Sequence, residues 1–165
     1  MSIRNIRVLE EDEILRKTAK PVKEMTARTF TLIQDMKETM YAANGVGLAA
    51  PQVGVLKRIF VVDCDQEDGR QNPIVFINPE ILEQSEETVT DNEGCLSVPN
   101  RHALVTRPEK VKVTALNEQM EPFTLEAEGL LARCICHEND HLNGVMYVDK
   151  AEGPVEQNTK ENGWA

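Results

Sequence analysis

Five short apolar segments, rich in β-branched residues, lie together in the middle of the chain. They span residues 58–63, 74–78, 103–107, 110–116 and 122–127. Segment 110–116 alternates apolar and polar side chains, as expected of a strand with one face in solvent, and only the polar stretch 117–121 separates it from the next, which predicts a hairpin. Because the segments are not interleaved with helical patterns, we predict an α+β fold with antiparallel sheets rather than a parallel βαβ sheet.

A helical pattern flanks these segments on each side. Residues 26–45 carry Phe30, Ile33, Met36 and Met40 at helical spacing, with Thr26 as the N-cap, so we predict an N-terminal amphipathic helix packed on the core. A second helix is predicted over residues 128–144, where a glycine ends it. We expect the sheets to pack around this central C-terminal helix.

Length and composition limit what the chain can be. At 165 residues it fits a single domain, which we place at residues 1–149, followed by a polar and flexible tail at 150–165 whose one large apolar residue is Trp164. The net charge of −10 argues against direct binding of nucleic acid. No apolar run is long enough to span a membrane, and the charged start predicts neither a signal nor a transit peptide, so we expect a cytoplasmic protein.

The predicted second helix carries a metal-ligand pattern. His137 and His141 are four residues apart, so both imidazoles can reach one point on the same helix face. Glu138 completes the sequence H-E-x-x-H, in which the glutamate acts as a general base in metal hydrolases. A helix with two surface histidines and an acid would also give this sequence, but the chain holds only three histidines and two of them are at ligand spacing.

A catalytic metal usually takes a third protein ligand, and the sequence offers four thiols for that position. Cys136 is rotated by roughly 100° from His137, and Cys134 is a turn too far back, so both are poor ligands. Cys64 and Cys95 remain. Cys64 lies in an apolar run typical of a buried strand, whereas Cys95 is flanked by turn formers and acids, which favours Cys95.

Residues 45–54, GVGLAAPQVG, form an unusual glycine-containing segment. They lack both the G-x-G-x-x-G pattern and a following lysine, so a phosphate-binding loop is weakly supported. The small side chains fit a tight strand whose backbone is open to an extended ligand. Gln52 would then supply an amide that can donate to a developing oxyanion.

Three segments together, GVGLAAPQ at 45–52, EGCLS at 93–97 and HENDHLNG at 137–144, resemble the three signature motifs of peptide deformylases in order and spacing. The similarity runs from about residue 5 to residue 149. It implies a metal-dependent hydrolase that removes the N-terminal formyl group from the formyl-methionine of newly synthesised polypeptides and releases formate. The expected partners are therefore N-formyl-methionyl nascent peptides.

The resemblance also implies a role for particular residues. Glu138 would take a proton from metal-bound water and pass it to the leaving amine, while Gln52 and the backbone N–H of Leu96 would stabilise the oxyanion. The implied metal ligands are Cys95, His137 and His141. The implied substrate-binding residues are Val46, Gly47, Gly94, Leu130, Cys134 and His137.

The expected cofactor is one divalent metal ion. Fe(II) follows from the resemblance, and Zn(II), Ni(II) or Co(II) also suit one thiolate with two imidazoles. We expect a monomer that works close to the ribosome, although the chain lacks the long basic C-terminal helix of many bacterial members. Cys136 and Arg133 depart from the residues common at their positions. Because of Arg133 and Asp91, the resemblance does not set the side-chain preference of the substrate pocket.

Two other functions compete with this hypothesis. A metallopeptidase of the HExxH type would need a third ligand downstream of the helix, where only acids are available. A non-catalytic metal-binding module could use Cys64, Cys95 and one helix cysteine, but it would leave Glu138 and Gln52 without a role.

Overall fold

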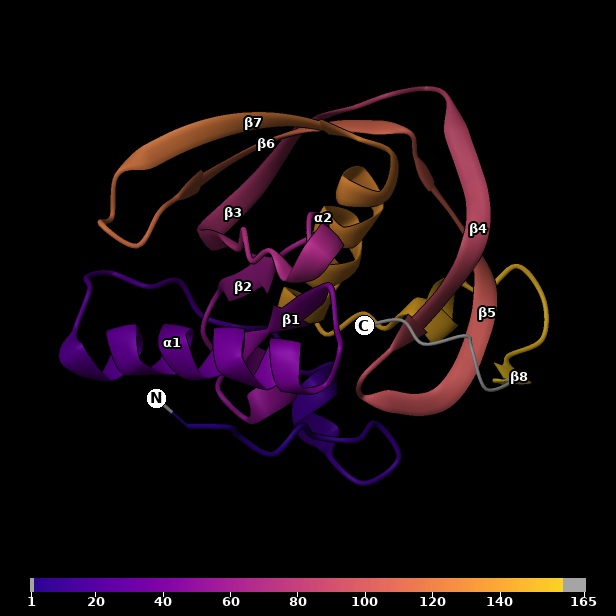
Figure 1. Cartoon of the computed structure of the whole chain (residues 1–165). Helices are drawn as coiled ribbons and strands as arrows, with labels where there is room; N and C mark the ends of the chain where they lie inside the picture. Colours follow the sequence, from indigo (N-terminus) through magenta and orange to yellow (C-terminus); the bar gives the residue numbers. More distant parts are fainter. Residues whose placement is uncertain (1, 159–165) are drawn as a thin grey trace.

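The computed structural model describes residues 2–158, and its regular elements are two α-helices, eight strands and four short 3-10 helices in that range (Figure 1). The helices are α1 (Ala27–Ala42) and α2 (Gly129–Leu142). The strands are β1 (Gly47–Ala49), β2 (Ile59–Val62), β3 (Ile74–Gln84), β4 (Thr88–Cys95), β5 (Val98–Pro108), β6 (Lys110–Leu116), β7 (Pro122–Glu128) and β8 (Glu156–Gln157). The 3-10 helices span Glu13–Arg16, Ala50–Val53, Glu67–Gly69 and Tyr147–Lys150.

The strands form two antiparallel sheets. One has five strands in the order β1-β2-β3-β6-β7, and the other has three in the order β4-β5-β8. Helix α2 contacts strands of both sheets and lies between them near the centre of the molecule (Figure 1). The prediction of an α+β fold with antiparallel sheets and a C-terminal helix is therefore confirmed.

The hairpin of β6 and β7 forms as the alternation of 110–116 predicts. Its register runs from Lys110 opposite Glu128 to Leu116 opposite Pro122. Val111, Val113 and Ala115 are buried on the inner face. Burying the apolar face of such a strand contributes about 25 cal/mol per Å² removed from water, which fixes the register.

The other predicted strands also occur, and the tight strand expected within residues 45–54 is β1. Strands β3 and β5 are longer than expected, and β4 and β8 were not predicted. Strand β4 is mostly exposed along residues 88–92, and it is held by pairing with β5 from Thr88 opposite Pro108 to Cys95 opposite Val98. A segment stabilised by a partner strand rather than by burial carries little apolar periodicity.

Helix α1 begins after Thr26, whose side-chain oxygen accepts a hydrogen bond from the backbone N–H of Thr29. Its buried apolar face is formed by Leu32, Ile33, Met36 and Met40. Placing Phe30 on this face was wrong, because its side chain is 50% exposed. Counted at 100° per residue, Phe30 lies about 120° from Met36, outside the buried stripe.

The segment that follows α2 runs back along β5. Ala151 forms a bridge with Val105, and β8 pairs with Arg101 and His102 of β5. Residues 159–165, with Trp164, lie outside the described residues. In residues 2–158, no helix combines the length and apolarity needed to cross a membrane.

Candidate metal centre and active site

Cys95, His137 and His141 converge on one buried point. The Cys95 Sγ lies 3.3 Å from Nε2 of His141, which lies 3.2 Å from Nε2 of His137. One donor atom from each residue fits within 4.8 Å of the others, and among residues 2–158 this is the one such cluster of three or more. Cys64 and the helix cysteines do not belong to it, which removes the four-ligand module based on them.

Two structural features bring these donors together. The histidines project from one face of α2, as their spacing predicts. Cys95 is the last residue of β4, just after an irregularity in the pairing with β5 at Glu93 and Cys95. Such an irregularity changes the face of the strand to which the next side chain points. Here it places the Cys95 thiol next to α2.

The carboxylate of Glu93 contacts Nδ1 of His137, the ring nitrogen that does not face the cluster. Its Oε1 lies 2.9 Å from Nδ1 of His137, and the Glu93 side chain is fully buried. Burial would raise the pKa of Glu93, but hydrogen bonds from Arg107 and His137 outweigh it and hold that pKa well below the usual range. A carboxylate on Nδ1 directs the lone pair of Nε2 toward the shared point, as in many metal sites.

Two buried arginines neutralise Glu93. Arg107 donates from Nε to Oε2 and from an Nη to Oε1, both at 2.9 Å, and Arg133 donates to Oε2 at 2.6 Å. Arg107 also donates to Asp140 at 2.6 Å, and Asp140 pairs with the half-exposed Lys150. Ion pairs and hydrogen bonds thus run without a break from Lys150 at the surface, through Asp140, Arg107 and Glu93, to His137.

Arg133 has a structural role that the sequence did not indicate, and it also lines a cavity of about 140 Å³ together with Leu130. Besides Glu93, its guanidinium donates to the backbone carbonyls of Val105 and Val89, so it ties α2 to β4 and β5. The sequence reasoning missed Glu93 and Arg107 altogether. The signal for Glu93 was its position in the EGCLS segment, but its partner is 44 residues away in the sequence.

Gln52 presents its amide beside the thiol. Its Oε1 accepts a hydrogen bond from the backbone N–H of Ala49 at 2.9 Å, which fixes the amide orientation. Nε2 then lies 3.4 Å from the Cys95 Sγ and 3.1 Å from Oγ of Ser97. A fixed N–H donor at the edge of a metal site is the arrangement needed for a developing negative oxygen.

Glu138 is fully buried next to the cluster, with Oε2 at 3.9 Å from Nε2 of His137. Neither carboxylate oxygen has a hydrogen-bond partner among the described residues. Burial, with the nearby charge of Glu93, raises the pKa of Glu138 well above its usual range. The side chain lies against Gly47, where a Cβ would be only 2.5 Å from Oε2, so the glycine makes room for this carboxylate.

The remaining predicted site residues differ in position and burial. Val46 precedes β1 and Gly47 is its first residue, and β1 pairs with β2 and forms an edge of its sheet. Leu96 is partly buried directly after Cys95. On α2, Leu130 is 48% exposed and borders a cavity of about 140 Å³, and Cys134 is fully buried.

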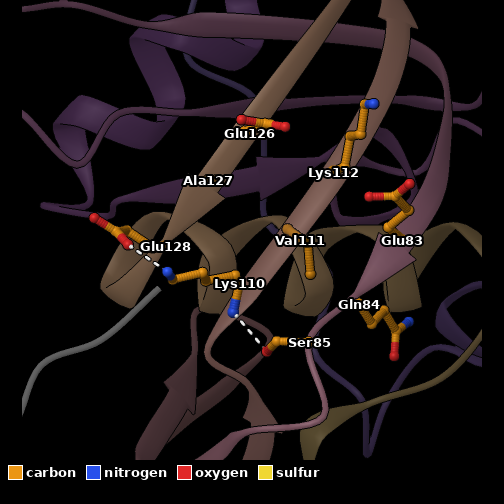
Figure 2. Close-up of a pocket in the computed structure, with 9 residues that line it drawn as sticks. All are labelled: Glu83, Gln84, Ser85, Lys110, Val111, Lys112, Glu126, Ala127 and Glu128. Atoms are coloured by element: carbon orange, nitrogen blue, oxygen red, sulfur yellow. Dashed lines mark hydrogen bonds and ion pairs between the residues drawn. The ribbon is translucent and has the colours of Figure 1, made fainter.

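Two other cavities lie away from the cluster. Cys136 faces one of about 360 Å³ together with Arg107, Asp140 and Lys150, and burial raises the pKa of its thiol to about 11. A cavity of about 500 Å³ lies over β3, β6 and β7 and is lined by side chains such as Lys110 and Glu128, an ion pair at 3.7 Å (Figure 2). No predicted site residue lines the latter, so the chemistry belongs to the buried cluster on α2.

The cluster fits a divalent metal ion by the chemistry of its donors. Burial lowers the pKa of both His137 and His141, which keeps the imidazoles neutral and able to coordinate. Burial raises the pKa of the Cys95 thiol, and a cation at the shared point would reverse that preference. One thiolate and two imidazoles leave a fourth position for water or substrate, as in catalytic metal sites.

Comparisons with known proteins agree with this geometry. The family model for polypeptide deformylase matches residues 3–157. A protein named peptide deformylase from Lachnoclostridium phytofermentans is 54% identical over 96% of this chain and 95% of its own length, and peptide deformylase 1 from Clostridium acetobutylicum is 57% identical over 91% of this chain and 95% of its own. The crystal structure of peptide deformylase from Thermotoga maritima is similar with a TM-score of 0.86 and 43% identity, over 93% of this chain and all of that one.

Proposed function

Because the chain belongs to the polypeptide deformylase family, we propose that its buried cluster hydrolyses the formyl group from the N-terminal formyl-methionine of nascent peptides. The chain is an enzyme of this class, and formate and a peptide with a free amino group are its products. The observation that carries the assignment is the convergence of Cys95, His137 and His141 beside Glu138 and Gln52.

Cys95, His137 and His141 would hold one divalent metal ion. We infer Fe(II) in the cell from the resemblance to peptide deformylases, with Zn(II), Ni(II) or Co(II) as substitutes, because one thiolate with two imidazoles suits all four. When bound, the ion acts as a Lewis acid and lowers the pKa of water toward about 7. Glu93, Arg107 and Arg133 keep His137 oriented for coordination.

Glu138 of the HExxH helix is the proton carrier. Its carboxylate, held against Gly47, has no other hydrogen bond to break before it accepts a proton from the attacking water. It then returns that proton to the nitrogen of the leaving amine. General acid–base catalysis of this kind contributes typically about 10²–10⁴-fold in rate.

Gln52 stabilises the negative charge that develops on the formyl oxygen. Its Nε2 is already aimed toward the cluster by the hydrogen bond between its Oε1 and Ala49. The backbone N–H of Leu96 is the second donor. Removing one such donor costs typically about 10²–10³-fold in turnover.

The peptide binds as an added strand beside the cluster. Strand β1, with Val46 just before it and Gly47 as its first residue, offers its backbone at a sheet edge, and Gly94 lies on β4 next to Cys95. The methionine side chain enters between Leu130, Cys134 and His137 of α2. Main-chain pairing gives affinity without dependence on the side chains that follow, as nascent peptides of many sequences require.

We further propose that the enzyme acts as a cytoplasmic monomer close to the ribosome, where its substrates emerge. We infer that residues 1–149 form the catalytic domain. Of the segment from residue 150 that the structure describes, Ala151 bridges Val105 and residues 156–157 pair with β5.

The function is tested by comparing three substrates under anaerobic conditions. Formyl-Met-Ala-Ser should release formate, while acetyl-Met-Ala-Ser, which differs only at the acyl group, should react far more slowly. Casein should remain intact. Cleavage of casein without formate release would identify a metallopeptidase and overturn the proposal.

A further inference from the structure

A pair of cysteines outside the metal cluster lies beside the proposed pocket. The Sγ atoms of Cys64 and Cys134 are 3.5 Å apart, although the residues are 70 positions apart in the sequence. Cys64 follows β2, and Cys134 is on α2, which packs against that strand (Figure 1). Both thiols are free.

The two thiols differ in access. Cys64 is half-buried, so a small solute can reach it, whereas Cys134 is fully buried in the core with Phe60 and Phe76. The hydrogen bond with Cys134 lowers the pKa of Cys64, against burial and the charge of Asp63, which both raise it. An accessible thiol with a buried neighbour matches the arrangement of an attacking and a resolving cysteine.

We propose that Cys64 and Cys134 form a redox-active dithiol that closes to an intramolecular disulfide when hydrogen peroxide oxidises it. A disulfide needs the sulfurs about 2.05 Å apart, so they must approach by about 1.5 Å. Rotation of the two side chains about their own bonds covers part of that distance, and the helix and strand are already packed together.

The chemistry balances with peroxide as the one added reactant. Cys64, as the thiolate, attacks a peroxide oxygen, the O–O bond breaks, and the departing hydroxide takes a proton to become water. Cys64 is then a sulfenic acid. The Cys134 sulfur attacks the Cys64 sulfur, the S–O bond breaks, and the hydroxide leaves with the Cys134 proton as a second water. A small-molecule thiol reverses the reaction by exchange.

The disulfide would also affect the proposed active site. Cys134 precedes His137 by three residues on α2, and we place its side chain in the wall of the methionine pocket. Drawing its sulfur toward Cys64 changes the shape of that wall without removing a metal ligand. This part rests on the proposed function, and it predicts a higher KM for formyl-Met-Ala-Ser with the metal content unchanged.

The test uses the nickel-loaded enzyme, whose metal is not oxidised by a few equivalents of hydrogen peroxide. After oxidation, denaturation and alkylation, the wild type should carry two alkyl groups fewer than the reduced protein. Its tryptic peptides 59–70 and 134–150 should be joined, with fragmentation placing the bond at Cys134 rather than Cys136. Cys64→Ser should lose the joined peptide, and Cys136→Ser, the matched control, should keep it.

Four outcomes separate the claims. Absence of the joined peptide, or a bond through Cys136, would overturn the dithiol. A joined peptide that survives dithiothreitol would contradict its reversibility. A joined peptide with an unchanged KM would overturn the link to the pocket. Failure of the reduced wild type to release formate would reject the proposed function instead, because the peptide mapping does not depend on activity.

Discussion

The Nδ1 atom of His137 lies 2.9 Å from Oε1 of Glu93, and both side chains are buried. This contact fixes the ring so that Nε2 faces Cys95 and His141. Glu93 thus acts through a metal ligand, not on the substrate.

Replacing this carboxylate should weaken metal binding. Glu93→Gln keeps the size but removes the charge that orients His137, so metal affinity should fall about 10–100-fold, as for other outer-shell partners. Competition with a chelator measures the change, with the exposed Glu83→Gln on β3 as the control. Equal affinities of Glu93→Gln and wild type would show that His137 needs no orienting carboxylate.

Arg107 should matter most for stability. Arg107→Met leaves Glu93 and Asp140 without their main partner in a buried setting, and breaking such pairs costs about 3–5 kcal/mol in the free energy of unfolding. Denaturant unfolding of the metal-saturated wild type and variant measures this loss in the free energy of unfolding.

The matched control is Lys110→Met, because the Lys110 and Glu128 side chains are 65% and 71% exposed. Exposed pairs contribute about 0–1 kcal/mol. A loss of stability in the control as large as that in Arg107→Met would mean that burial of the network does not decide its contribution.

Gly47 should be needed for catalysis more than for folding. Gly47→Ala puts a Cβ 2.5 Å from Oε2 of Glu138, and the flexible carboxylate must move away. A misplacement of this size can cost about 100-fold in turnover, with metal content retained. Gly153→Ala, whose Cβ would meet nothing within 4 Å, should behave as the wild type.

Asp35 should make stability depend on pH in the acid range. Burial would raise the pKa of this carboxyl, but hydrogen bonds from the Ser2 N–H and Arg4 hold it below its usual 3.8. A depressed pKa stabilises the fold above the unfolded-state value, and that stabilisation is lost as pH falls below about 4.

Asp35→Asn should therefore be about 1–2 kcal/mol less stable than wild type at pH 7, with the difference shrinking toward pH 3. Unfolding curves of both proteins between pH 3 and pH 7 show how the difference in their free energies of unfolding changes with pH. A difference that stays constant would assign the loss to packing rather than to the charge.

The sequence could predict the parts of the site that depend on local spacing. His137, Glu138 and His141 could be predicted because they lie within about one turn of a helix. Cys95 could be predicted because turn-forming residues flank it. Strand pairs with alternating burial, such as β6 and β7, were also predictable. The site-residue roles beyond the ligand cluster stay predictions.

The parts that depend on distant contacts could not be predicted. The hydrogen bond from Arg133 to Glu93 could not be predicted, because nothing local shows that this side chain reaches a residue 40 positions away. Strand β4 was missed because its partner strand, not its own pattern, stabilises it. Phe30 was wrongly placed on the buried face of α1 because three other apolar residues follow it at helical spacing. Its own position around the helix axis nevertheless puts its side chain in solvent.

The most direct test of the central claim is an anaerobic assay of formyl-Met-Ala-Ser with the wild type and Glu138→Ala, together with the metal content of each. We predict equal metal content and a loss of turnover of about 10²–10⁴-fold in the variant, because Glu138 carries the proton but does not hold the metal. Equal turnover of the two proteins at equal metal content would contradict the account.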